Sequence, residues 1–170
     1  MYYSEIKALS VENGPGIRVS LFVSGCRNHC KGCFQPETWD FCYGQPFTAE
    51  AEGRILSLLG SAYISGLSVL GGEPFEEENQ EGLISLLRAV RREYPRKSIW
   101  VYTGYIYDKD LVPGGRKYAQ YTDELLSLVD VVVDGPYLES RRNPSLSFKG
   151  SDNQRIVDVP DALRERNRQL

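Results

Sequence analysis

Three cysteines near the amino terminus are the residues of this sequence most able to do chemistry. Cys26, Cys30 and Cys33 follow the spacing C-x3-C-x2-C, so their thiolates can converge on one metal centre. A [4Fe–4S] cluster takes four cysteines for full protein ligation, and three leave one iron open to a small molecule. An amine and a carboxylate together would chelate that iron, and the amino-acid end of S-adenosylmethionine carries both groups. The spacing therefore fits an iron–sulfur cluster with one iron open to a chelate of this kind.

A structural zinc site is the main alternative interpretation of the same residues. Either Cys42 or His29 lies close enough in sequence to supply a fourth zinc ligand. Structural zinc sites usually show two ligand pairs separated by a longer loop, whereas here three ligands are bunched together. A disulfide between two of the cysteines is a further alternative, which the reducing cytoplasm disfavours. Cys42 also fits a small buried hydrophobic residue.

The bulk composition is that of an ordinary globular domain. The 170 residues are 41% hydrophobic and 25% charged, and the formal net charge is -3. This charge gives no electrostatic basis for binding nucleic acid or an anionic membrane. The sequence offers no apolar run long enough to span a bilayer, and its first residues lack the pattern of a signal peptide. We therefore expect a single domain in the cytoplasm.

Stretches typical of strands and helices alternate along the chain. Apolar runs predict strands at 17–24, 67–70, 98–103 and 131–133, with a further strand near 155–159. Helical spacing predicts helices after an N-cap at Thr48, over 76–94, and after an N-cap at Thr122. Strands that alternate with helices form right-handed βαβ units. The pattern predicts an α/β fold with a mostly parallel sheet.

The ends of these strands carry most of the residues that could hold a ligand. Parallel strands place their ligand sites at their carboxyl ends, on one edge of the sheet. We expect that edge to bring together Gly25 and Cys26, residues 71–73, residues 103–104 and residues 134–135. Segments far apart in the sequence would thus form one site.

The cysteine motif and a glycine-rich segment together resemble the radical-SAM superfamily. The motif follows a first strand and precedes the aromatic Phe34, and residues 71–74 (GGEP) follow the next strand. The resemblance implies that Gly71, Gly72 and Glu73 hold the methionine end of S-adenosylmethionine. Glycines let backbone carbonyls approach a ligand, and the carboxylate of Glu73 would accept hydrogen bonds from the ammonium group.

The same resemblance implies further cofactor-binding residues. Gly32 and Phe34 flank Cys33 and would line the adenine pocket. Thr103 and Asp134 are weaker candidates for binding the ribose, the carboxylate or a cation. Asp134 fits equally well a strand-end carboxylate whose hydrogen bonds are satisfied within the protein.

Several further segments resemble, in the same order, the activating proteins of glycyl-radical enzymes. The nearest resemblance is to those that act on anaerobic ribonucleoside-triphosphate reductases, and it runs from about residue 13 to about residue 155. The segments are residues 13–18 (NGPGIR), 21–26 (LFVSGC), 38–39 (TW), 44–48 (GQPFT), 99–105 (IWVYTGY), 133–135 (VDG), 143–146 (NPSL) and 149–155 (KGSDNQR). Cys42, residues 108–120 and the tail 159–170 depart from the pattern, and residues 108–120 resemble an inserted loop.

This resemblance implies a reaction and partners. One electron from the cluster would break the S–C5′ bond of S-adenosylmethionine, and the resulting 5′-deoxyadenosyl radical would take a hydrogen atom from a glycine of the reductase. Residues 13–16, a turn by composition, would form a lip near that glycine. The partners would be the reductase and an electron donor such as a flavodoxin, in a homodimer or in a heterotetramer with the reductase.

The resemblance also implies the architecture, a single radical-SAM domain over residues 1–170. We expect an open partial (β/α) barrel, because a closed eight-stranded barrel takes about 250 residues. An open side would admit a glycine loop from a protein substrate. The alternatives are a different glycyl-radical activase, a small radical-SAM enzyme similar to 7-carboxy-7-deazaguanine synthases, and a non-enzymatic adaptor that binds zinc.

Overall fold

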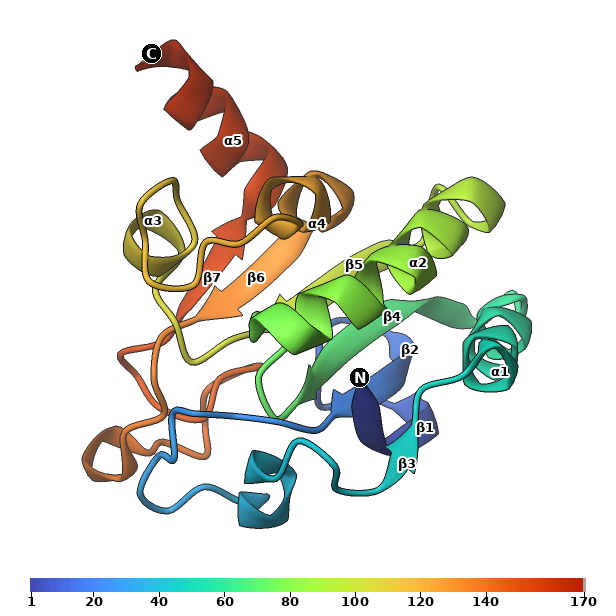
Figure 1. Cartoon of the computed structure of the whole chain (residues 1–170), viewed down its shortest axis with the longest axis horizontal. Coiled ribbons are helices and arrows are strands. Elements are labelled where there is room, and N and C mark those ends of the chain that lie inside the picture. Colours follow the sequence, from blue (N-terminus) through green and yellow to red (C-terminus); the bar gives the residue numbers. More distant parts are fainter. Residues whose placement is uncertain (170) are drawn as a thin grey trace.

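The computed structural model describes residues 1–169 of the chain, which form one mixed sheet covered by helices (Figure 1). The sheet has seven strands in the order β3-β1-β2-β4-β5-β6-β7. The strands are β1 (Tyr2–Ser10), β2 (Ile17–Val23), β3 (Gln45–Pro46), β4 (Ile64–Gly71), β5 (Ser98–Tyr102), β6 (Val131–Asp134) and β7 (Arg155–Asp158). The helices are α1 (Ala49–Leu59), α2 (Glu77–Glu93), α3 (Tyr107–Asp110), α4 (Thr122–Leu128) and α5 (Val159–Arg168), with 3-10 turns η1 (Pro36–Trp39) and η2 (Glu139–Arg141).

The sheet is parallel only in its centre. Strands β2, β4, β5 and β6 pair in parallel, whereas β1, β3 and β7 pair antiparallel to their neighbours. The α/β class is confirmed, but the prediction of a mostly parallel sheet is corrected. The edge strands account for the difference, because β1 precedes β2 in a short hairpin and therefore runs in the opposite direction.

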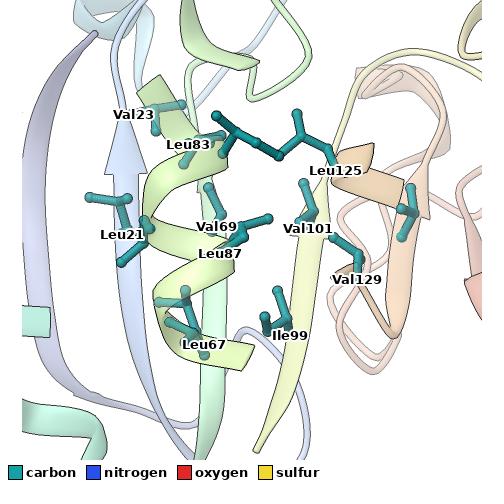
Figure 2. Packing of buried hydrophobic residues seen from close by; sticks show 14 of the residues in the cluster. Leu21, Val23, Leu67, Val69, Leu83, Leu87, Ile99, Val101, Leu125 and Val129 are labelled. Atoms are coloured by element: carbon teal, nitrogen blue, oxygen red, sulfur yellow. The ribbon is translucent and has the colours of Figure 1, made fainter. Parts of the chain in front are cut away.

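The apolar core lies between the sheet and its helices. Because successive side chains of a strand point to opposite faces, Leu67 and Val69 of β4 both reach this layer. Figure 2 shows Leu83 and Leu87 of α2 packed over them, with Ile99 and Val101 of β5 beside them. The helical spacing predicted over 76–94 is thus confirmed by α2, in which Leu83, Leu87 and Val90 are buried at helical spacing.

The opposite face of the sheet is polar and aromatic. The side chains of Arg18, Ser20, Ser68 and Trp100 alternate with the core residues and are buried without belonging to the apolar core. Arg18 is fully buried and donates to the carbonyl oxygens of Leu67 and Ser98, among other acceptors. This face therefore carries a hydrogen-bonded layer rather than a second apolar core.

Several local predictions are refined. Thr48 caps α1 as expected, because its hydroxyl accepts from the Ala51 N–H at 3.4 Å. Thr122 is instead the first residue of α4, whose N-cap is Tyr121. The Thr122 hydroxyl accepts from the Ala119 N–H at 2.8 Å and lies 2.8 Å from Gln80 Oε1, so it joins α4 to α2.

Two segments that depart from the family pattern have regular structure. Residues 108–120 include most of α3, and the tail forms α5 up to Arg168. Among residues 1–169, no helix combines the length and the apolarity needed to cross a membrane.

Candidate functional site

A cavity of about 770 Å³ opens at the carboxyl ends of the parallel strands. The segments that follow β2, β4 and β5 all contribute to its lining, as strand-end geometry predicts. Of the sequence-predicted site residues, the cavity is lined by Cys26, Cys30, Gly32, Cys33, Phe34, Gly71, Gly72, Glu73 and Thr103. Asp134 does not line it. One cavity thus brings together the two motifs that are far apart in the sequence.

The loop that carries the three cysteines is held by its backbone. Gly25 adopts a φ of +99°, and a Cβ at this position would lie 2.4 Å from the Phe41 ring. The Gly25 N–H donates to the carbonyl oxygen of Thr38 at 2.7 Å, which fixes the loop against η1. His29, also left-handed with a φ of +46°, stacks on the Trp39 ring at 4.5 Å between centroids. His29 therefore packs within the loop and does not line the cavity.

The three cysteines line the cavity together. All three thiols are free, Cys26 is buried, and Cys30 and Cys33 are half-buried. Across residues 1–169, no three Cys, His, Asp or Glu side chains converge closely enough to coordinate one ion. In a cubane each thiolate binds a different iron, so the sulfur atoms need not meet at one point. Cys42 is exposed and outside the cavity, so it gives the zinc interpretation no fourth ligand there.

The environment of two of the thiols, Cys26 and Cys30, favours their protonated form. Burial raises the pKa of the Cys26 thiol to about 11 and also raises the pKa of Cys30. Iron binding must therefore release protons from these residues.

The Gly-Gly-Glu segment is bound directly to the end of β2. Gly71 has a φ of +104°, and a Cβ there would lie 2.6 Å from the carbonyl oxygen of Val23. The Gly72 N–H donates to that oxygen at 2.7 Å, and the Glu73 N–H donates to the carbonyl oxygen of Gly25 at 2.8 Å. Only glycine fits this close approach. The two hydrogen bonds join the Gly-Gly-Glu segment to the start of the cysteine loop.

The Glu73 carboxylate already accepts hydrogen bonds from the protein. It accepts from the Thr103 hydroxyl at 2.8 Å and from the N–H groups of Phe75 at 3.0 Å and Gly104 at 2.8 Å. The Asn28 side chain donates to it at 3.2 Å. Burial raises the pKa of Glu73 to about 7, against the opposing effect of these hydrogen bonds. Thr103, expected as a cofactor ligand, thus also acts as a donor that orients Glu73.

Asp134 is fully buried at the end of β6 and engaged elsewhere. Its carboxylate accepts from the Tyr107 N–H at 2.7 Å and from the Arg155 guanidinium, with Nε at 2.9 Å. These contacts favour the alternative that Asp134 is a strand-end carboxylate satisfied within the protein.

A buried charge network beside the cysteine loop was not predicted. Glu76 is fully buried and accepts from the Arg27 N–H at 3.0 Å and from Arg27 Nη1 at 2.7 Å. Lys117, in the segment interpreted as an inserted loop, donates to the same carboxylate at 2.6 Å. Burial acts to raise the pKa of Glu76, but the hydrogen bonds from Lys117 and Arg27 outweigh it and lower the pKa. The sequence analysis predicted Glu76 only as the first residue of the helix over 76–94 and gave no indication of this network.

Residues 136–154 form a further wall of the cavity, which we call the wall loop. They supply more of the lining residues than any other segment. The resemblance marked parts of this segment, but no pattern in its composition indicated that it folds over the cavity.

Comparisons with known proteins agree with this geometry. A family model described as "4Fe-4S single cluster domain" matches residues 12–157. The anaerobic ribonucleoside-triphosphate reductase-activating protein of Escherichia coli (strain K12) is 38% identical over 156 residues, which cover 91% of this chain and 96% of the relative. The protein of the same name from Enterobacteria phage T4 is 38% identical over 165 residues, or 96% of this chain and 97% of the relative. The protein of the same name from Vibrio cholerae is 37% identical over 161 residues, which cover 92% of this chain and 97% of the relative.

The matched family model and the cavity define the class of protein, an α/β domain that carries one iron–sulfur cluster. Similarity over nearly the whole length of the relatives narrows the assignment. The chain belongs to the family of anaerobic ribonucleoside-triphosphate reductase-activating proteins.

Proposed function

We propose that this chain is a radical-SAM activating enzyme that generates a glycyl radical on an anaerobic ribonucleoside-triphosphate reductase. The observation that carries the proposal is that one cavity is lined both by the three cysteines and by the Gly-Gly-Glu segment. Membership of the activating-protein family supports the choice of reductase as the protein substrate.

Cys26, Cys30 and Cys33 would hold a [4Fe–4S] cluster through three of its irons. When bound, the cluster would supply the single electron that cleaves S-adenosylmethionine. Gly71 and Gly72 would give the methionine end close access to the backbone, and Glu73 would present its carboxylate to the amine. Gly32 and Phe34 would line the adenine side.

Thr103 and Asp134 would act mainly as positioning residues. Thr103 holds Glu73 by a hydrogen bond of 2.8 Å, and Asp134 holds Arg155 and the start of α3. The buried walls of the cavity would keep water away from the reacting atoms.

The architecture and partners complete the proposal. The sheet would be the partial (β/α) barrel of the radical-SAM type, and residues 1–170 would form a single domain. An electron donor such as a flavodoxin would reduce the cluster in the cytoplasm. The active species would be a homodimer or a heterotetramer with the reductase.

The test is S-adenosylmethionine cleavage by the reconstituted protein. The chain is purified without oxygen, loaded with iron and sulfide, reduced, and assayed for 5′-deoxyadenosine. Wild type should form this product, whereas Cys26→Ala, Cys30→Ala and Cys33→Ala should form none above background. Cys42→Ala is the matched control, because Cys42 is exposed and outside the cavity.

Two results would contradict the proposal. Zinc without iron in protein purified anaerobically would favour the adaptor. Full cluster loading without 5′-deoxyadenosine would exclude radical-SAM chemistry.

A further inference from the structure

The wall loop is firmly anchored at its base. Arg142 and Ser151 form an isolated antiparallel bridge across it. The Gln154 side chain accepts from the Gly150 N–H at 2.8 Å and donates to the carbonyl oxygen of Gly135 at 3.1 Å. The Asn153 side chain donates to the carbonyl oxygen of Pro136 at 2.8 Å. These bonds fix where the loop leaves and rejoins the fold.

The tip of the wall loop, residues 143–149, contacts the sheet through an aromatic ring. Among residues 1–169, the hydrogen bonds of residues 144–149 stay within the loop itself. Phe148 links the tip to the sheet, since its ring meets the Trp100 ring edge-on with centroids 5.5 Å apart. An aromatic pair of this geometry contributes more than its buried area alone.

Phe148 has a backbone conformation that its side chain does not favour. Its φ is +62°, and apart from His29 in the cysteine loop it is the only non-glycine residue with a positive φ among residues 1–169. Such a conformation persists only when the surroundings determine it, and it is concentrated at functional sites. In this conformation the Phe148 ring contacts Trp100.

Trp100 also connects the tip to Asn13, in the segment 13–16 that was predicted to form a lip of the site. The Arg18 guanidinium lies 5.7 Å from the centroid of the Trp100 ring and donates to Ser68 Oγ at 2.7 Å. Ser68 Oγ in turn donates to the carbonyl oxygen of Asn13 at 2.6 Å. Asn13 lines the same cavity as Phe148. A continuous chain of contacts therefore runs from Phe148 through the buried side chains of Trp100, Arg18 and Ser68 to Asn13.

The tip is also accessible from outside. Pro144 lines the cavity and is exposed, and Leu146 lines it and is half-buried. A polypeptide must pass an accessible wall to bring one of its α-carbons into the cavity.

We propose that Phe148, seated on Trp100, is a positioning residue that holds the tip of the wall loop where it receives the glycine-bearing segment of the protein substrate. This inference rests on the proposed function. It assigns to the wall loop the placement of the substrate polypeptide rather than the binding of the cluster.

The experiment uses the cluster-loaded enzyme and the full-length reductase. Phe148→Ala is compared with wild type for the KM for reductase and for the glycyl radicals formed per 5′-deoxyadenosine. We expect the KM for reductase to rise about tenfold, because the polypeptide binds more weakly. The number of glycyl radicals formed per 5′-deoxyadenosine should fall, because the glycine is placed less well. Phe148→Tyr keeps the ring and should restore both values. Ser147→Ala is the matched control, since Ser147 is exposed and does not line the cavity.

The outcomes separate this inference from the proposed function. Wild-type values of the KM and of the radical ratio in Phe148→Ala would overturn the inference alone. A cluster-loaded wild type that forms no 5′-deoxyadenosine would overturn the proposed function and the inference with it.

A second measurement needs no variant and applies if Phe148→Ala does not fold. Amide hydrogen exchange is followed in the wild-type holoenzyme with and without the reductase. Slower exchange over residues 143–150 on adding the reductase supports the inference, and unchanged exchange there overturns it.

Discussion

The N–H of Arg27 donates to the buried Glu76 carboxylate at 3.0 Å, and the Arg27 guanidinium binds the same carboxylate at 2.7 Å. Arg27 directly follows Cys26, and Glu76 directly precedes α2. One fully buried carboxylate therefore ties the cysteine loop to the helix that covers the sheet. Lys117 donates to the same Glu76 carboxylate, so the segment 108–120 is tied to the cysteine loop and to α2 as well.

Glu76→Gln should destabilise the fold. The variant leaves the largely buried Lys117 beside a neutral group, whereas the half-exposed Arg27 keeps Glu78 as a partner. Removing one partner of a largely buried ion pair is costly. We expect the free energy of unfolding to fall by about 2 to 4 kcal/mol in urea titrations of the metal-free protein. Glu77→Gln is the control, because Glu77 is exposed and neighbouring in sequence. Equal losses in the two variants would show that the Glu76 network has no special role.

The same carboxylate predicts a dependence of stability on pH. The pKa of Glu76 is lower in the folded protein than its ordinary value of 4.5, so the unfolded chain binds the proton more tightly. Its contribution is fully present above pH 4.5 and is lost as the pH falls through the folded pKa. Urea titrations from about pH 6 to about pH 3 should show a smaller decline for Glu76→Gln than for wild type. Parallel declines would contradict the assignment.

Two glycine-to-alanine variants should change stability in opposite directions. In Gly71→Ala the new Cβ would lie 2.6 Å from the Val23 carbonyl oxygen, at a φ of +104°. We expect a loss of about 2 kcal/mol or more. In Gly53→Ala, inside α1, no atom lies within 4 Å of the new Cβ. There a gain of about 0.5 to 1 kcal/mol is expected, because alanine favours the helix. Thermal unfolding measures both, and a tolerated Gly71→Ala would refute the close-approach argument.

The sequence predicted the central elements and the cavity because their signals are local. Cysteine spacing, the Gly-Gly-Glu segment and the apolar runs of β2, β4, β5 and β6 are each readable within a few residues. Strand β1 was missed because register shifts interrupt its two-residue period, so that Tyr3, Ile6 and Ser10 are buried at irregular spacing. Strands β1 and β7 both pair antiparallel to their neighbours. Because β1 was missed and the direction of β7 was not predicted, the sheet was expected to be more parallel than it is.

The partners of buried polar groups were not readable from the sequence. Thr103 and Asp134 were predicted as weaker candidates for binding the cofactor because they lie at strand ends, and Asp134 fitted a satisfied strand-end carboxylate equally well. In the structure their side-chain oxygen atoms bond to Glu73, Arg155 and Tyr107, residues that are distant in sequence. Such pairings depend on packing between elements, which carries no local signature.

The most direct test of the central claim is the electron paramagnetic resonance signal of the reductase after incubation with the reduced, cluster-loaded protein and S-adenosylmethionine. The account predicts a glycyl radical on the reductase with wild type and with Cys42→Ala, and none with Cys30→Ala. A cluster-loaded wild type that cleaves S-adenosylmethionine but leaves no radical on the reductase would contradict the assignment of this protein substrate.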